Sequence, residues 1–308
     1  MVIKIQDLFR KSMYRNYIKI LRYYEQLGSD SSVLSRFVIE KGIVALVLLG
    51  GIFMKWTFPS RAIGGWRWIW CFRWEIITGW YEYDTVQWCK RLINPGMNAI
   101  DIGANIGYYS RLFSKLVDSS GKVLAYEPSP ENFSILQSNL RTLSRHNTTV
   151  FSLAISNQVE KVPLFISPGH SNHSLKPGYV EHESVIDVDA TSLDEHLTIL
   201  DQTKIHFVKI DAEGSEIDIL MGMQKTIANN PSLGMIIELN PAALRAGGHE
   251  PKDLLELVAS LGFIAREIAP GDQLLEPNPM EFQNSCNLLC LKPEAWKNAR
   301  KSIEHKAG

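Results

Sequence analysis

The stretch that most constrains the fold of this chain is NAIDIGANIGYYSRL, residues 98–112. An apolar run ends in Asp101, a turn containing Gly103 and Gly107 follows, and an apolar segment with helical spacing comes next. This order is typical of a nucleotide-binding turn, in which glycines let the backbone approach a ligand and a helix N-terminus favours an anionic group. A dinucleotide fingerprint requires G-x-G-x-x-G, and Asn105 stands where its second glycine belongs. Because Asn tolerates positive φ best among the non-glycine residues, it fits the middle of such a turn.

From residue 97 onward, short apolar strands alternate with amphipathic helices, which predicts an α/β fold. The hydrophobic content of 45% and the charged content of 21% are ordinary for a globular protein with a substantial core. Ligands of such sheets bind at the carboxyl ends of the strands, so the ends of the predicted strands mark the expected site. The predicted strands are 97–103, 122–128, 148–156, 205–212 and 233–240, with a closing pair at 262–268 and 287–293; the predicted helices are 107–117, 130–144, 193–200, 215–229 and 251–261.

A second acidic residue, Glu127, stands at the end of the second predicted strand, in KVLAYEP. A carboxylate at this position can accept hydrogen bonds from both hydroxyls of a ribose. Pro128 ends the strand, and Ser129 and Pro130 begin the next helix. The glycine turn, the spaced acid and the five strands together predict a site for a nucleoside cofactor. The alternative is a glycine turn that only reverses the chain.

Several ordered blocks carry a family resemblance. AIDIGANIGYYS and YEPSPENF resemble the first two motifs of S-adenosylmethionine-dependent methyltransferases. ATSLDEHL, FVKIDAEGSEIDILMG and IIELNP are similar to the FkbM-type methyltransferase family, over roughly residues 78–292. The resemblance implies a class I methyltransferase (Rossmann-like) fold, with a seven-stranded, mostly parallel sheet that is flanked by helices and ends in an antiparallel strand. It also implies O-methylation of sugars, polyketides or similar small molecules. Composition and spacing alone do not select a methyl donor over another nucleoside cofactor.

The resemblance also implies roles for the residues that match the family's motifs. The loop from Asp101 to Gly107 would face the methionine part of S-adenosyl-L-methionine, with helix N–H groups for its carboxylate and the Gly103 carbonyl for its ammonium. Glu127 would hold the ribose, and the end of the third strand would lie near the adenine. The implied cofactor-binding residues are Asp101, Gly103, Ala104, Asn105, Gly107, Glu127 and Ser152.

The segment HFVKIDAEGSE offers residues for the chemistry. Lys209 and Asp211 are two positions apart, so they share one face of the strand near its carboxyl end, and Glu213 follows in the turn. A hydroxyl acceptor needs a base, and we expect Asp211 and Glu213 to shape the site, one of them as base or metal ligand. Lys209 would restrain their charge or contact the substrate. The alternative is that Glu213 and Glu216 cap a helix and that Lys209 and Asp211 form a structural ion pair.

A metal ion and a histidine are two further alternatives for this site. Asp211, Glu213 and Glu238 offer hard oxygen ligands that suit Mg²⁺, but no spacing requires a metal, and no residue is assigned to one. His170 and His173 lie in SPGHSNHSLKPG, a segment bounded by Gly, Pro and Ser. This segment is either a substrate lid with a catalytic histidine or a loop whose histidines are simply solvated.

Residues 1–75 form a basic N-terminal extension outside the resemblance, before a methyltransferase domain at 76–295 and a tail at 296–308. Residues 1–91 carry 14 Lys and Arg against 7 Asp and Glu, whereas the remainder carries 18 against 26. The extension contains a basic amphipathic helix within 3–28 and a Trp-rich strand at 66–74. Its apolar run at 42–54 would rise about 20 Å as a helix, too short for a bilayer core of about 30 Å. The run is either a helix buried on the core or, with the basic helix, a peripheral membrane contact.

Composition narrows the location and the partners. Cys286, Cys290 and the two other cysteines form no CxxC pair, and no secretory signal is evident, so we expect a cytoplasmic protein, with residues 1–55 as a candidate contact to the inner membrane face. Nucleic acid is not expected as a partner because the catalytic part is net acidic. The expected partner is a small-molecule or glycan hydroxyl acceptor. The alternatives are a nucleotide-sugar-dependent glycosyltransferase using Asp187 and Asp189 of IDVDA, and a non-catalytic binding or anchoring module in glycan assembly.

Overall fold

The computed structural model describes residues 81–141, 146–168, 172–279 and 282–297. The chain divides into two compact units, Met1–Asp84 and Thr85–Gly308, and nearly all described residues belong to the second. The helix, the apolar run and the Trp-rich strand predicted within residues 1–75 lie outside the described residues. Among the helices of the described ranges, none combines the length and the apolar character that a membrane crossing requires.

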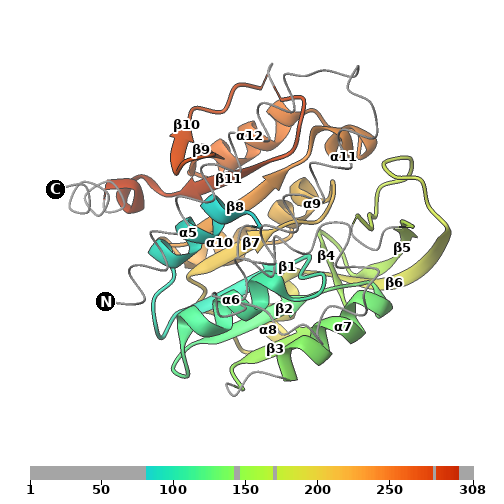
Figure 1. Ribbon diagram of the computed structural model, residues 1–308, viewed down its shortest axis with the longest axis horizontal. Helices are drawn as coiled ribbons and strands as arrows, with labels where there is room; N and C mark the ends of the chain where they lie inside the picture. The colour runs from blue at the N-terminus through green and yellow to red at the C-terminus, as the bar shows by residue number, and fades with distance from the viewer. Residues whose placement is uncertain (1–80, 142–145, 169–171, 280–281, 298–308) are drawn as a thin grey trace, which may run out of the picture. The chain divides into compact units, whose positions relative to one another are not determined.

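A large sheet forms the centre of the second unit (Figure 1). Its strands are β1 (Asn98–Ile102), β2 (Lys122–Tyr126), β3 (Thr148–Phe151), β7 (Phe207–Ile210), β8 (Gly234–Leu239), β9 (Ile264–Ala269), β10 (Gln273–Leu275) and β11 (Cys286–Leu291). Their order in space is β10-β9-β11-β8-β7-β1-β2-β3. The strands β3, β2, β1, β7 and β8 pair in parallel, and β11 runs antiparallel to both β8 and β9. The expected mostly parallel sheet with an antiparallel closing strand is confirmed, and the short β10 adds an eighth strand.

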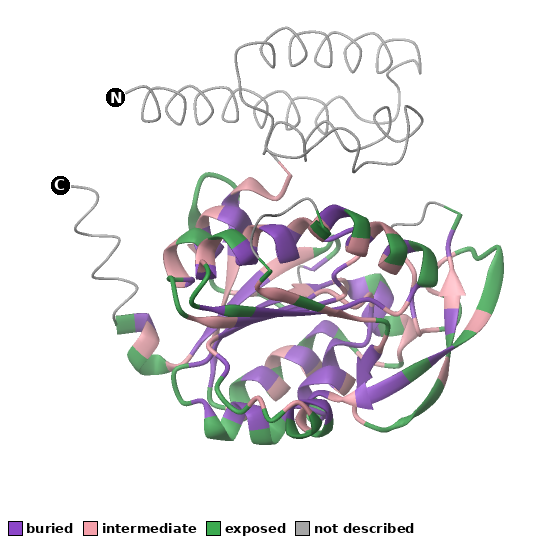
Figure 2. Cartoon of the chain, turned by 90° about the horizontal axis from the view of Figure 1, so that it is seen from below, coloured by how far each residue is buried: buried purple, intermediate pink, exposed green. Residues whose placement is uncertain are grey.

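Helices cover both faces of this sheet. They are α5 (Tyr83–Leu92), α6 (Tyr108–Val117), α7 (Pro130–Arg141), α8 (Leu193–Ile199), α9 (Glu216–Met221), α10 (Gln224–Asn229), α11 (Pro241–Ala246) and α12 (Pro251–Ser260). Figure 2 shows buried residues concentrated along the sheet and on the sides of the helices that face it, with exposed residues outside. Such one-sided burial is what the helical spacing of the apolar residues predicts.

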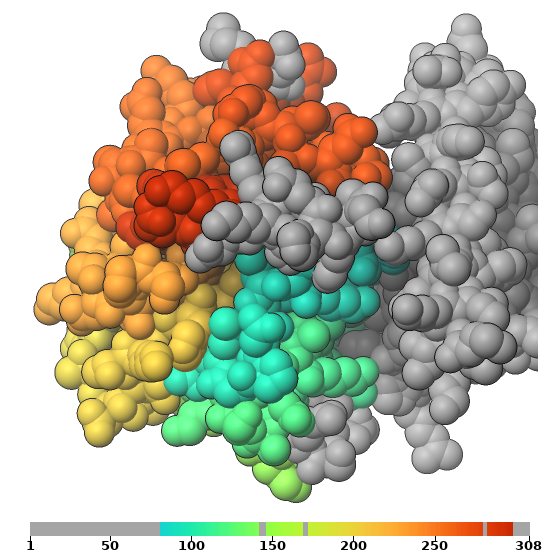
Figure 3. All heavy atoms as spheres, turned by 90° about the vertical axis from the view of Figure 1, so that its left-hand side faces the viewer, coloured from blue at the N-terminus to red at the C-terminus, as the bar shows by residue number. Residues whose placement is uncertain are grey.

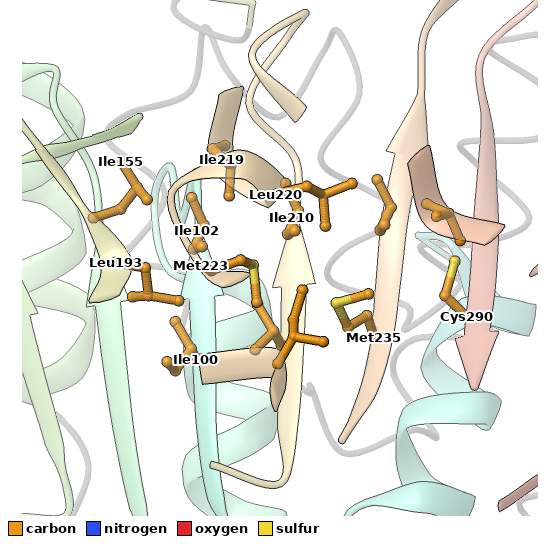
Figure 4. Packing of buried hydrophobic residues seen from close by; sticks show 14 of the residues in the cluster. Ile100, Ile102, Ile155, Leu193, Ile210, Ile219, Leu220, Met223, Met235 and Cys290 are labelled. Atoms are coloured by element: carbon orange, nitrogen blue, oxygen red, sulfur yellow. The ribbon is translucent and has the colours of Figure 1, made fainter. Parts of the chain in front are cut away.

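Alternation along the strands decides which helices lie on which face. Ile100 of β1 belongs to one buried cluster with Leu193 of α8 and Leu220 of α9 (Figure 4). On the opposite face, Phe113 of α6 meets Phe207 of β7 edge to face, with ring centroids 5.6 Å apart. Because successive side chains of a strand point to opposite faces, each strand contributes to both layers. Because β1, β2, β3, β7 and β8 pair in parallel, their carboxyl ends lie at one edge of the sheet, between the two helical layers.

The predicted strand at 148–156 is wrong as one element. It breaks at residues 152–153, and β4 (Ala154–Ser156) leaves the large sheet to join β5 (Glu160–Ile166) and β6 (Ser184–Ser192) in the order β4-β6-β5. Ala154 packs there with Leu164 and Val188, so tertiary packing overrides the continuous strand pattern. The Asp187–Asp189 pair lies in β6 of this small sheet.

The predicted helix at 215–229 is also wrong as one element, because it divides into α9 and α10 at Gly222. A Cβ at Gly222 would lie 2.0 Å from the carbonyl oxygen of Ser156, so the backbone of the small sheet approaches at this point. The new helix start is capped by Asp194, whose carboxylate accepts the backbone N–H groups of Lys225 (2.8 Å) and Thr226 (2.7 Å). The cap comes from a residue far away in sequence, which helical periodicity does not reveal.

The closing strands lead to the end of the described chain. The indole N–H of Trp296 donates to the carbonyl oxygen of Ile264 in β9 at 2.9 Å, and the Trp296 side chain is buried. In Figure 3 the last described residues, in dark red, lie against the orange part of the second unit. The chain is thus packed on the second unit as far as Trp296.

Candidate active site

The loop between β1 and α6 contains three left-handed residues, Gly103 (φ 77°), Asn105 (φ 49°) and Gly107 (φ 90°). Asn105 thus adopts the conformation expected for the middle of the turn. A Cβ at Gly103 would lie 1.8 Å from the carbonyl oxygen of Asp211, which directly follows β7. Only glycine fits there, and the loop therefore lies directly against the end of β7.

Glu127 directly follows β2 and is bonded to this loop. Its Oε2 accepts the N–H of Asn105 at 2.8 Å, and its Oε1 accepts the N–H of Ser129 at 2.9 Å. The N–H of Ala104 donates to the carbonyl oxygen of Tyr126 at 2.9 Å, which further fixes the loop to β2. Glu127 is only 5% exposed, and burial raises its pKa to about 7. A carboxylate oxygen has two lone pairs, so each oxygen can accept one more donor such as a ribose hydroxyl.

Asp101 and Ser152 lie on either side of Glu127 in the sheet. Asp101 is buried, and its Oδ2 accepts the hydroxyl of Ser110 in the first turn of α6 at 2.5 Å. Burial raises the pKa of Asp101 to about 6. Ser152 directly follows β3 and is exposed. The structure therefore places the seven expected cofactor residues at the carboxyl ends of the neighbouring strands β1, β2 and β3.

Lys209 and Asp211 form an ion pair at the end of β7. The Lys209 ammonium donates to Asp211 Oδ2 at 2.6 Å and lies 4.6 Å from the ring centre of Tyr109 in α6. The side chain of Lys209 is 1% exposed and that of Asp211 is 26% exposed, so the ammonium end of this ion pair is sheltered from solvent. Burial acts to raise the pKa of Asp211, but Lys209 and a hydrogen bond with Glu238 outweigh it and hold that pKa below its ordinary value. Asp211 is thus ionised, and the two side chains share one face as expected.

Glu213 and Glu238 complete an acidic cluster with Asp211. One oxygen of each carboxyl group lies within 4.8 Å of one oxygen of the other two. Burial and the Asp211 carboxylate raise the pKa of Glu238 well above its ordinary value. Burial, with Asp211 next, raises the pKa of Glu213 to about 8. The Lys209 ammonium offsets part of the charge of this cluster, whose three carboxyl groups are spaced closely enough to hold a metal ion.

Two residues bonded to Glu213 were missed by the sequence analysis, Tyr179 and Asn240. The Tyr179 hydroxyl donates to Glu213 Oε2 at 2.8 Å. The Asn240 side-chain N–H₂ group donates to the same oxygen at 3.2 Å and to the Tyr179 hydroxyl at 2.7 Å. The Asn240 Oδ1 accepts the N–H of Ala243 and so caps α11. The Asn-Pro step after an apolar strand is a signal for such a cap, whereas no local pattern marks Tyr179.

The remaining candidates have structural contacts. Glu216 accepts the N–H groups of Ala212 (3.1 Å) and Gly214 (3.0 Å), and this holds the turn after β7. The capping alternative therefore applies to Glu216, whereas the Glu213 side chain bonds Tyr179 and Asn240 instead. His173 accepts the N–H of Ser167 through Nδ1 at 3.1 Å. His170 lies outside the described residues.

The strand order with its reversed closing strand, the glycine loop after β1 and the acid after β2 together define a class I methyltransferase (Rossmann-like) fold. The family model described as "Methyltransferase FkbM domain" matches residues 101–265, more than half of the chain. The chain belongs to the FkbM methyltransferase family.

Two curated proteins and many solved structures are similar to the chain. It is 28% identical over 161 residues to "Hexuronic acid methyltransferase AglP" of Haloferax volcanii, covering 52% of this chain and 60% of that protein. It is 26% identical over 145 residues to "Methyltransferase 1" of Beauveria bassiana, covering 40% of this chain and 57% of that protein. The matches thus span less than two thirds of either relative. An rRNA methylase structure from Streptococcus thermophilus aligns at 12% identity and a TM-score of 0.42, covering 68% of this chain and 95% of that one.

Proposed function

We propose that this methyltransferase transfers the methyl group of S-adenosylmethionine to a hydroxyl of a sugar, glycan or secondary metabolite. The observation that carries the proposal is the contact between Gly103 and Asp211, where a Cβ would lie 1.8 Å from the carbonyl oxygen. This contact places the loop that would hold the cofactor against the acidic cluster that would bind and deprotonate the acceptor hydroxyl. Donor and acceptor would then meet at one edge of the sheet, and positioning of this kind supplies much of the acceleration in group transfer.

The residues present fit the cofactor. The glycines let the backbone approach it, and the start of α6 offers N–H groups to its carboxylate. Glu127 retains lone pairs for the ribose hydroxyls, and the exposed Ser152 after β3 would lie beside the adenine. When bound, the cofactor would supply an electrophilic methyl group on its sulfonium. Asp101, Glu127 and Asp211 would stabilise that positive charge.

Glu213 is the best candidate for the base that takes the proton of the acceptor hydroxyl. Asp211 is ionised, but its charge is paired with Lys209, and the pKa of Glu238 is raised well above its ordinary value by burial and by Asp211. The pKa of Glu213, raised to about 8 by burial, lies near neutral pH, where a general base works best. In this role Glu213 would accept the proton of the acceptor hydroxyl as the acceptor oxygen gains the methyl group. Asp211 would keep a negative charge in the site, and Lys209 would hold the Asp211 carboxylate in place through their ion pair.

A sugar acceptor is supported by one relative, whose printed name is a hexuronic acid methyltransferase. The glycosyltransferase alternative is less well supported. Asp187 and Asp189 are exposed in β6, and Asp189 pairs with Lys161 at 2.9 Å on the small sheet. A magnesium ion at Asp211, Glu213 and Glu238 remains a lesser alternative, because Lys209 already pairs with Asp211.

Methyl transfer to oxygen can be tested with S-adenosylmethionine carrying a ¹³C methyl group. The protein is incubated with it and with hexoses, hexuronic acids and their glycosides, and the products are read by NMR. We expect a methyl signal at the shift of an O-methyl sugar. Glu213→Gln should slow its formation by about 10²- to 10⁴-fold, the usual contribution of a general base. Glu256→Gln, an exposed site on α12, is the matched control and should leave the rate unchanged. Label on nitrogen, carbon or RNA, or an unaffected Glu213→Gln variant, would contradict the proposal.

A further inference from the structure

A segment that precedes β6, residues 172–183, is fastened to the turn after β7. The Ser174 hydroxyl donates to the backbone carbonyl of Glu213 at 2.6 Å. The Lys176 ammonium donates to Asp218 of α9 at 2.6 Å, and both side chains are largely buried. These contacts bring a part of the chain that belongs to neither the cofactor loop nor the large sheet into the acidic cluster.

Tyr179 of this segment and Asn240 restrain one oxygen of Glu213. Both hydrogen bonds, at 2.8 Å and 3.2 Å, end on Oε2. Within the described ranges, no donor contacts Oε1. The Asn240–Tyr179 bond at 2.7 Å and a further bond from Asn172 orient the tyrosine hydroxyl toward Glu213. Burial raises the pKa of Tyr179, so its hydroxyl keeps its proton and stays a donor throughout the pH range of a neutral enzyme.

We propose that Tyr179 and Asn240 are positioning residues for methyl transfer, which hold Oε2 of Glu213 and leave Oε1 for the proton of the acceptor. This inference rests on the proposed function for its catalytic meaning. The two donors favour the ionised form of Glu213, because they bond a carboxylate more strongly than a carboxylic acid. The segment 172–183 is then part of the active site and not only a connection between two strands.

The ionisation of Glu213 depends on charges from several elements. Asp211, which follows β7, and Glu216, which begins α9, both disfavour the ionised form of Glu213. Glu238 of β8 faces the same cluster. Lys209 acts on the same cluster through its ion pair with Asp211. Tyr179 and Asn240 oppose these two acids by lowering the pKa of Glu213. Removing one of these two donors should therefore raise the pH at which Glu213 loses its proton.

A thermal-unfolding titration of the full-length protein tests this without any acceptor. The melting temperatures of the wild type and of Glu213→Gln are compared from pH 5 to pH 9.5. Because the pKa of Glu213 is raised in the folded state, its contribution to stability is present at low pH and is lost as pH rises toward about 8. In Tyr179→Phe this loss should extend about one pH unit higher, since a hydrogen bond to a charged group is lost. In the double variant with Glu213→Gln, the effect of Tyr179→Phe should no longer vary with pH.

Two variants separate positioning from simple packing. Tyr126→Phe removes another buried tyrosine hydroxyl, bonded to His196 at 2.9 Å, and should leave the Glu213 midpoint in place. Asn240→Asp keeps an oxygen for the cap of α11 but removes the donor, and should also raise the midpoint. A Tyr179→Phe effect that is the same at every pH, or the same with and without Glu213, would overturn the proposal. S-adenosylmethionine affinity is measured separately on the same proteins, so a failure of the proposed cofactor site is distinguishable from a failure of this inference.

Discussion

At the scale of single residues, Gly103 links the cofactor loop to the acidic cluster. Gly103→Ala would combine a left-handed φ of 77° with a Cβ placed 1.8 Å from the Asp211 carbonyl oxygen. We expect it to lower the free energy of unfolding by about 3 kcal/mol or more, measured by urea denaturation. Gly178→Ala is the matched control, because Gly178 has a φ of 78° but no atom within 4 Å of the added Cβ. Its cost should be only about 1 kcal/mol. Equal losses for the two variants would show that the close approach to Asp211 is unimportant.

Sequence reasoning worked for residues whose role depends on nearby positions. The left-handed Asn105 and the shared face of Lys209 and Asp211 follow from local geometry, and both are observed. Tyr179 could not be found in this way, because it lies 34 positions from Glu213 in a segment without regular periodicity. The sequence also does not reveal which carboxyl groups have raised pKa values. Those shifts arise because folding buries acids from strands that lie far apart in sequence close to one another.

At the scale of elements, the start of α10 depends on Asp194 of α8. Its carboxylate accepts two backbone N–H groups and the hydroxyl of Thr226 at 2.7 Å. Asp194→Ala should lower the free energy of unfolding by about 1–2 kcal/mol, the usual cost of a lost helix cap. Urea denaturation measures this, with Glu195→Ala at the exposed neighbouring position as control. No difference between the two variants would mean that α10 forms without this cap.

The predicted and observed bounds of the strands and helices agree for some elements and differ for others. Strands with a continuous apolar run, such as β1, β2, β7 and β8, were found near their true bounds because they are buried on both faces. The breaks at residues 152–153 and at Gly222 were missed because they arise where β4 leaves the large sheet and where its backbone approaches the junction of α9 and α10. The pairing of β5 with β6 was missed as well, although the segment between these two strands contributes Tyr179.

At the scale of the whole molecule, the parallel sheet and its reversed closing strand were predicted from the alternation of strands and helices and from the family motifs. That prediction holds for the second unit, Thr85–Gly308. The charge asymmetry of the chain still predicts a separate task for the basic extension, and the membrane contact of residues 1–55 stays a prediction. The proposed function of the second unit depends above all on a cofactor held between the β1 loop and Glu127.

Calorimetric titration of the full-length protein with S-adenosylmethionine tests that claim most directly. We expect a dissociation constant of about 1–100 μM and a roughly tenfold weaker one for Glu127→Ala, since a charge-assisted hydrogen bond to the ribose is lost. Glu256→Ala, at an exposed site on α12, should bind like the wild type. Folded wild-type protein that does not bind S-adenosylmethionine, or a folded Glu127→Ala variant that binds it equally well, would contradict the account.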